Sequence, residues 1–260
     1  MVSVQVKRAS FLIMNPFANH NIKICTDCSG LIEEEVFLSG STFGAVFYTD
    51  GKVESPMLPE QFALIKCPHC LSLLWSNDLE MIKYDDIQVN SVKPYLKPDF
   101  YAYLYKLDND IDNKKEEYLR IKAWHVGNDQ RRKSDNKSEI SKYEIDNLKA
   151  LEGMHALNDD SLVFQAEIKR ELSLFDDSIA LLENFEDFSM DVSCTIRRLS
   201  FEKNPFVSLV DEYCEEFYDN NVKKTDGYRV NDNKHGLWIE RYPDGSKKSS
   251  AIYEDGLIVK

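Results

Sequence analysis

The chain contains Cys25-Thr26-Asp27-Cys28 and, after a further 38 residues, Cys67-Pro68-His69-Cys70. Each of these two C-x2-C pairs, called knuckles below, supplies two thiolates, and four thiolates satisfy the tetrahedral geometry that zinc accepts. Four sulfur ligands leave no position open for water. The spacing therefore predicts a structural zinc site made by Cys25, Cys28, Cys67 and Cys70. Two disulfides or four buried thiols are the alternatives.

The sequence around both knuckles has the pattern of β-strands. Ile22-Lys23-Ile24 leads into the first knuckle, and Ile65-Lys66 leads into the second. Between them, Thr49-Asp50-Gly51-Lys52 is a hairpin turn signal, because Asp-Gly tolerates positive φ. We therefore expect a folded β insert between the knuckles and assign residues 1–97 to a zinc-ribbon-like β domain.

Four short blocks of this domain resemble uncharacterised bacterial zinc-ribbon proteins. The resemblance implies the ribbon fold and no known activity. The blocks are Ser41-Thr42-Phe43-Gly44, Tyr48-Thr49-Asp50-Gly51-Lys52, Pro56-Met57-Leu58-Pro59 and Lys66-Cys67-Pro68-His69-Cys70.

The period of the sequence becomes helical over residues 98–220. Two sets of residues each lie on one face at the i, i+3, i+4, i+7 spacing of an amphipathic helix. We expect the histidine in each set at the edge of the core, because neither has a metal-spaced Cys, Asp or Glu partner on its face. The sets are Tyr118, Ile121, Trp124 and His125, and Leu148, Leu151, Met154 and His155.

Two features inside this segment predict where helices begin and end. Gly127 to Lys137 is polar and reads as a loop, in which Arg131-Arg132-Lys133 is solvated. Asn204 is a helix N-cap signal before Pro205, which suits the first helical position. The apolar stripe expected for that last helix is Leu209, Val210, Tyr213 and Phe217.

The middle of the helical segment resembles a tetratricopeptide repeat, in which a small residue lets two helices approach and an aromatic residue follows a tight turn. The resemblance implies a TPR-like helical domain that binds peptides or proteins. One repeat cannot bury its own apolar face, so it needs neighbouring helices at 141–157 and 191–218. An unrelated small helical bundle is the alternative. The matching residues are Leu162, Ala166, Ser173, Phe175, Ser178, Ile179 and Leu182.

In residues 221–260, aromatic strands alternate with glycine-containing turns. The pattern resembles the MORN-type repeat, particularly the bacterial variant of antitoxin-like proteins, and implies a β-hairpin cap with Trp238 and Tyr242 in its core. An independent ligand-binding array is the alternative. The recurring units are Lys234-His235-Gly236-Leu237-Trp238, Tyr242-Pro243-Asp244-Gly245-Ser246 and Tyr253-Glu254-Asp255-Gly256, with Gly227-Tyr228 as the remnant of another.

Most of the negative charge lies in one segment. The chain has a net charge of −13, and residues 141–220 carry 19 acidic and 7 basic side chains. Such a surface repels nucleic acid, because affinity for phosphates comes largely from Lys and Arg. It is either a solvated helical face or a docking surface for a basic partner, with Glu167 and Glu171 among its carboxylates.

No catalytic motif is present. The chain has no Walker loop, dinucleotide glycine fingerprint, G-x-S-x-G elbow or H-E-x-x-H helix. It also has no apolar run long enough to span a bilayer. The cysteines outside the knuckles, Cys194 and Cys214, suggest no disulfide framework, so we expect a reducing compartment, the bacterial cytoplasm.

The sequence therefore predicts an α+β multidomain protein with three parts: a zinc-ribbon-like domain (1–97), a TPR-like helical domain (98–220) and a MORN-like β-hairpin cap (221–260). We expect a non-enzymatic, protein-binding role, as an adaptor or as an antitoxin or immunity protein, with structural zinc. The expected partner is another protein, basic or a toxin, and neither a membrane nor nucleic acid. The alternatives are an enzyme with a site between ribbon and helices, and a nucleic-acid-binding ribbon.

Overall fold

A computed structural model describes most of the chain. The described residues are 18–37, 39–82, 91–107, 111–132, 138–154, 159–183, 191–230, 233–254 and 256–259. Within these ranges, no helix combines the length and the apolar character needed to cross a membrane.

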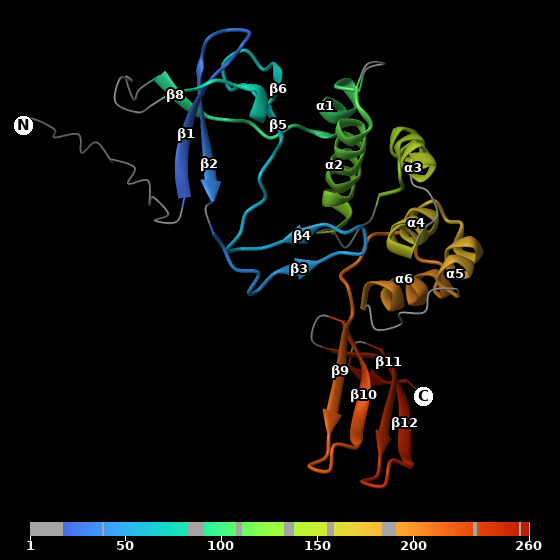
Figure 1. Cartoon of the computed structure of the whole chain (residues 1–260). Coiled ribbons are helices and arrows are strands. Elements are labelled where there is room, and N and C mark those ends of the chain that lie inside the picture. Colours follow the sequence, from blue (N-terminus) through green and yellow to red (C-terminus); the bar gives the residue numbers. More distant parts are fainter. Residues whose placement is uncertain are drawn as a thin grey trace, which may run out of the picture. The chain divides into compact units, whose positions relative to one another are not determined.

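The protein is a mixed α+β structure with sheets at both ends of the chain and helices in the middle (Figure 1). It divides into two compact units. Unit 1 comprises Met1–Ala45 and Ser55–Pro98, and unit 2 comprises Val46–Glu54 and Asp99–Lys260. The predicted insert is therefore split: its central hairpin belongs to unit 2, whereas the rest of it belongs to unit 1.

Unit 1 contains a four-stranded sheet, in the order β7-β1-β2-β8, and the separate hairpin β5–β6. The pair β1–β2 is antiparallel and runs in register from Ala18↔Phe37 to Ile24↔Leu31, next to the first knuckle. The strands are β1 (Ala18–Ile24), β2 (Leu31–Phe37), β5 (Leu64–Lys66), β6 (Leu73–Trp75), β7 (Met81–Ile82) and β8 (Val92–Pro94), with a short 3-10 helix η1 (Ser76–Asp78) after β6.

The core of unit 1 is small and surrounds the knuckles. Two of its members are cysteines, one from each knuckle, so the core and the predicted metal site are continuous. The buried residues of this cluster are Cys25, Ile32, Ile65, Cys67, Leu74 and Leu79.

Unit 2 begins with the hairpin of β3 (Val46–Phe47) and β4 (Val53–Glu54), whose turn has Gly51 at φ 78°. The predicted Asp-Gly hairpin turn is confirmed. Within the described residues, helices α1 to α6 follow, and apolar clusters lie between them: one joins α2, α3 and α4, and another joins α4, α5 and α6. The helices are α1 (Phe100–Tyr105), α2 (Asn113–Arg132), α3 (Lys142–Met154), α4 (Asp159–Glu171), α5 (Phe175–Glu183) and α6 (Asp191–Phe201).

The helices α4 and α5 form the tight hairpin that the repeat-like pattern predicts. Ala166 is fully buried, and the Ser178 hydroxyl donates a hydrogen bond of 2.8 Å to the Ala166 carbonyl. Ser173, in the turn, has a φ of 63°. Small side chains at this crossing therefore let the two helices approach each other.

Two predicted helix boundaries are wrong. The expected loop at 127–137 begins too early, since α2 continues to Arg132. The helix expected from Pro205 is absent from the described residues, because α6 ends at Phe201 and the chain instead enters strand β9. Tyr213 and Phe217 recur at a spacing that fits a helix, but these residues pair with β10 instead.

The C-terminal sheet has five antiparallel strands in the order β13-β12-β11-β10-β9, each paired with its neighbour in sequence. It therefore begins before residue 221, within the segment expected to be helical. The strands are β9 (Glu212–Phe217), β10 (Lys223–Val230), β11 (Asn233–Arg241), β12 (Lys247–Glu254) and β13 (Leu257–Ile258).

Trp238 is the centre of this sheet, as the sequence predicts, and is 5% exposed. A Cβ at Gly227 would lie 2.5 Å from its ring, so the opposite strand needs a glycine there. The indole N–H donates a 3.0 Å hydrogen bond to the Tyr228 carbonyl, and the Lys234 ammonium lies 4.2 Å from the ring centroid. Tyr242, expected beside it in the core, is 48% exposed, because it follows β11 at the turn.

Replacing Trp238 with alanine should destabilise the sheet by about 3–5 kcal/mol, the usual cost of a large side chain that leaves a cavity. Leu237→Ala is the matched control, because Leu237 is the adjacent residue of β11 and is 53% exposed. Denaturant unfolding, followed by the amide signals of β10 to β12, measures both. Equal effects of the two substitutions would contradict the central role of Trp238.

Candidate metal centre and a buried polar network

The two knuckles have the same backbone structure. In the first, between β1 and β2, the Cys25 amide donates to the Gly30 carbonyl at 3.0 Å, and the Ser29 amide donates to the Cys25 carbonyl at 2.9 Å. The second knuckle, between β5 and β6, repeats both bonds at Cys67, with Ser72 and Leu71 in the equivalent positions, at 2.9 and 3.0 Å. Ser29 and Leu71 both have positive φ, at 59° and 67°. Each knuckle is thus a tight loop that presents two sulfurs.

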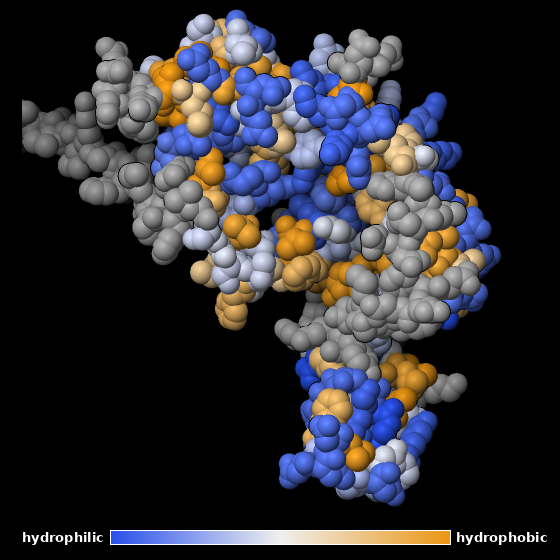
Figure 2. Space-filling view, in the orientation of Figure 1, coloured by the Kyte–Doolittle hydropathy of each residue, from blue (hydrophilic) through white to orange (hydrophobic). Residues whose placement is uncertain are grey.

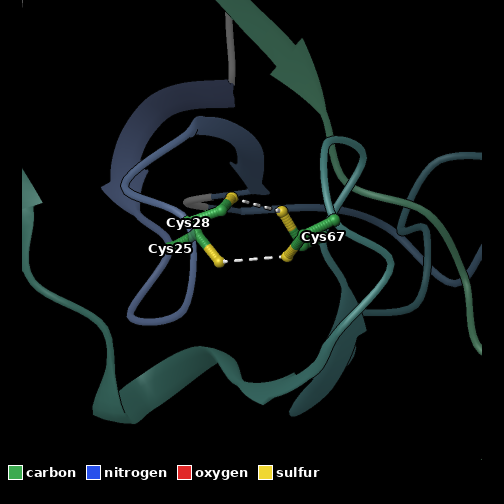
Figure 3. Close-up of side chains that lie close together, drawn as sticks. Cys25, Cys28 and Cys67 are labelled. Carbon is green, nitrogen blue, oxygen red and sulfur yellow. Dashed lines mark hydrogen bonds between the residues drawn. The ribbon is translucent and has the colours of Figure 1, made fainter.

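The four sulfurs face one another across the two loops (Figure 3). All of them lie within 4.8 Å of one another, with 3.7 Å between Cys25 and Cys70 and 3.8 Å between Cys28 and Cys67. Sulfurs bound about 2.3 Å from one tetrahedral zinc are about 3.8 Å apart. The cluster that the sequence predicts is therefore compatible with a zinc site, and all six cysteines are free thiols, without disulfides.

The thiols of this cluster differ in acidity. Burial raises the pKa of Cys25 to about 12. The Ser72 hydroxyl, 3.2 Å from the sulfur of Cys70, is the main reason why the pKa of Cys70 falls to about 6. Since a metal binds thiolates, binding at Cys25 must release a proton to solvent.

His69, within the second knuckle, holds the two loops together. Its Nε2 lies 2.9 Å from the Leu31 carbonyl oxygen, at the end of the first knuckle. The ring also packs on Gly30, where an added Cβ would lie 2.5 Å from the imidazole. Neither contact was apparent in the sequence.

Unit 2 contains a second cluster of polar groups, around the tip of the β3–β4 hairpin. Asp50 forms a two-pronged ion pair with Arg132, and both side chains are fully buried. Asn128 donates to Asp50 at 3.0 Å, and His125 Nε2 lies 3.0 Å from the Asp50 carbonyl oxygen. The hairpin tip is thereby inserted against α2.

The same network continues into α4. The Asn128 amide also donates to Glu171, at 3.0 Å, and the Trp124 indole N–H donates to that carboxylate at 3.0 Å. Arg170 pairs with Glu167 and reaches the Thr49 hydroxyl at 3.4 Å. Glu167 and Glu171 were expected on an acidic surface, but they are 0% and 3% exposed.

Burial and neighbouring charges give the groups of this network unusual acidities. Burial alone would raise the pKa of Asp50, but the hydrogen bonds and charges of its neighbours, those of Arg132 first among them, together outweigh that effect and lower it. The pKa of Glu171 is raised well above its usual value by burial and by the charges of Glu167 and Asp50. Burial also lowers the pKa of His125. Glu171 is thus protonated in the folded protein under conditions that ionise an exposed carboxyl group.

The sequence pattern does not predict this network. Asp50 fits a turn, and Arg131 and Arg132 fit a solvated loop. Arg131 is buried, and the Arg132 side chain is inaccessible. A signal was present, because Asn128 and Arg131 continue the face of Trp124 at spacings of four and seven residues. The expected core histidine His125 is confirmed at 8% exposure, whereas His155 and Lys133 lie outside the described residues.

Comparison with family models, with curated proteins and with solved structures yields no match. No family model thus supports the tetratricopeptide or MORN resemblance. What remains is the local geometry: a helical hairpin, a tryptophan-centred meander and the four-cysteine cluster.

Replacing Glu171 with glutamine should raise the stability of the protein at neutral pH and flatten its pH dependence. The folded state holds a proton on Glu171 that the unfolded state has released, so wild-type stability falls as pH rises from the ordinary carboxyl range toward the raised pKa. Each tenfold difference in proton affinity corresponds to about 1.4 kcal/mol. Glutamine keeps an oxygen that accepts from Trp124 or Asn128 without this penalty.

Denaturant unfolding from mildly acidic to mildly alkaline pH measures the effect. Glu183→Gln, on the exposed end of α5, is the matched control and should leave the pH profile unchanged. A Glu171→Gln protein with the wild-type slope would show that Glu171 is ionised in the folded state.

Proposed function

We propose that the chain is a non-enzymatic protein-binding protein whose unit 1 contains a structural zinc ion. The observation that carries the proposal is the β3–β4 hairpin, which exposes apolar side chains while its tip is fixed in a buried ionic network. A rigid element with exposed apolar side chains is typical of a binding surface. Such exposure is unfavourable unless a partner covers the apolar side chains.

Four thiolate ligands support a structural role for the zinc. The sulfur separations of 3.7 and 3.8 Å are compatible with a closed tetrahedral site, and a closed site has no position for a substrate or a reactive water. The ion would join the loops β1–β2 and β5–β6, which are distant in sequence.

Protein purified without a chelator should contain one zinc ion per chain, bound through Cys25, Cys28, Cys67 and Cys70. Cys67→Ser should lower the zinc content and destabilise unit 1, because metal binding contributes to folding by ~10 kcal/mol or more in small zinc domains. Elemental analysis and thermal unfolding measure these effects, with Cys194→Ser as the control outside the cluster. Metal-free wild-type protein that unfolds at the same temperature would contradict the proposal.

The apolar surface of the hairpin comprises Phe47 and Val53, which are 52% and 42% exposed, and the opposite face adds Val46, which is 38% exposed. Phe47 and Val53 are cross-strand partners and therefore lie on the same face. In Figure 2, orange and pale orange atoms mark this hairpin at the position of β3 and β4 in Figure 1.

A basic protein is the partner that the charge of unit 2 supports. Residues 141–220 carry the excess of acidic side chains, and several of them are exposed. Exposed charges steer a partner during encounter, although each pair adds only about 0.2–1 kcal/mol to binding. The exposed carboxylates include Asp146, Asp176, Asp177, Glu183, Glu202, Glu215 and Glu216.

A partner recovered from the native host by pull-down should bind at least about tenfold more weakly to the double variant Phe47→Ser/Val53→Ser, since two exposed apolar side chains are lost from the interface. Leu237→Ser, also an exposed apolar position in a strand, should not change the affinity. Added salt should slow association more than it speeds dissociation. Unchanged affinity of the double variant would exclude the hairpin as the binding surface.

The finer proposal is that the partner is a toxin that the chain neutralises, as an antitoxin or immunity protein. It rests on the likeness of residues 227–260 to the MORN-type variant of antitoxin-like proteins, together with the acidic surface. Rescue of cells from the toxicity of the recovered partner, on co-expression of this chain, is its test.

A further inference from the structure

Unit 1 contains a pocket of about 430 Å³ away from the cysteines. It lies over the inner face of β1 and β2, where Asn21 and Glu34 are cross-strand partners and Lys23 follows on the same face. Along this face of β2, apolar Ile32 belongs to the core, and the next residue on the same face, Glu34, is polar and lines the pocket. The 3-10 helix η1 contributes Ser76 and Asn77 to the pocket. The volume is within the range of small-molecule sites.

Three buried polar side chains form the floor of this pocket: Lys23, Glu34 and Ser76, which are 6%, 7% and 2% exposed. The Lys23 ammonium donates to the Ser76 carbonyl at 2.9 Å, to the Ser76 hydroxyl and to Glu34. The Ser76 hydroxyl donates to Glu34 Oε1 at 2.7 Å. The trio is a closed ring of hydrogen bonds with no net charge.

The bonding capacity of the trio defines what it can still bind. An ammonium has three N–H donors, and all three of Lys23 are used within the ring. The carboxylate of Glu34 can accept about four hydrogen bonds, so it retains acceptor capacity after those from Lys23 and Ser76. The floor therefore offers acceptors and no donors. A ligand must bring an N–H or O–H group. An anionic ligand would be repelled by the Glu34 carboxylate and would find no free donor on the floor.

The walls add two further requirements. Asn21 and Asn77 present side-chain amides, which both donate and accept. Gln61 adds a third amide, and Phe62, Leu79 and Met81 are among the apolar lining residues. Met81 is 62% exposed, so an apolar body would cover it. A cationic head would lie close to the buried Lys23 ammonium. A neutral head group that donates and accepts, on an apolar body, satisfies all of these groups.

We propose that this pocket binds a small neutral organic molecule that carries a primary amide on an apolar or aromatic body. The amide N–H groups donate to Glu34, its carbonyl accepts from Asn21 or Asn77, and the body lies against Phe62 and Met81. This binding site is separate from the cysteine cluster and from the hairpin surface, and it requires neither the zinc nor the protein partner of the proposed function.

Benzamide, benzoate and benzylamine test the proposal, because they share one aromatic body and differ in the charge of the head. Each is titrated into the full chain and followed by backbone amide NMR. Benzamide should shift the signals of Ser76 and Asn77 and bind at least about tenfold more tightly than either charged analogue, a difference of ~1.4 kcal/mol. Equal affinities, or shifts located elsewhere, would overturn the proposal.

Variants separate recognition of the amide by the polar floor from non-specific apolar binding in the pocket. The double variant Lys23→Met/Glu34→Leu replaces the ion pair with apolar side chains, a change that buried pairs often tolerate without loss of stability. It should keep the wild-type melting temperature and lose the preference for benzamide. Glu35→Gln, the next residue of β2 and on the opposite face, should retain it. A double variant that binds benzamide as the wild type does would overturn the proposal even if the protein is folded.

Discussion

Cys25 and Cys67, which are metal-type ligands, both belong to the buried cluster at the core of unit 1. Small domains commonly need a metal or disulfides for stability. The identical turns of the two knuckles bring four sulfurs to about the separation that a tetrahedral ion imposes. The contact between His69 Nε2 and the Leu31 carbonyl oxygen joins the two turns. The pocket floor lies on the same face of β2 as the cysteine core, because Glu34 is two residues from Ile32.

Unit 2 depends on charge to a comparable degree. Three buried carboxylates, Asp50, Glu167 and Glu171, adjoin the buried guanidinium groups of Arg132 and Arg170. Burial, together with the charges of Glu167 and Asp50, raises the pKa of Glu171 well above its usual value. Buried ion pairs contribute little net stability, but removing one partner is costly because the other charge remains buried. If the hairpin were displaced, buried charges would lose their partners, which is unfavourable. The network therefore fixes the position of the hairpin more than it adds net stability.

The sequence predicted the features that depend on local chemistry. The cysteine spacing indicated the cluster, Asp50-Gly51 the turn, and Trp238 the centre of the last sheet. It failed where long-range partners decide the structure. Tyr213 and Phe217 fit a helical stripe, but pairing with β10 makes them part of a strand. Arg132 has the composition of a solvated loop residue, and only the approach of Asp50, 82 positions earlier in the chain, buries it.

The division of the insert between the units has a consequence for the path of the chain. Because Val46–Glu54 belongs to unit 2, the backbone passes from one unit to the other three times, after Ala45, after Glu54 and after Pro98. No single cut separates the units into independent contiguous pieces. A fragment that ends at Pro98 would carry Asp50 away from Arg132, and Arg132 in the complementary fragment would lose its buried carboxylate partner. Moving either unit 1 or the helices into another protein therefore requires moving the hairpin Val46–Glu54 as well.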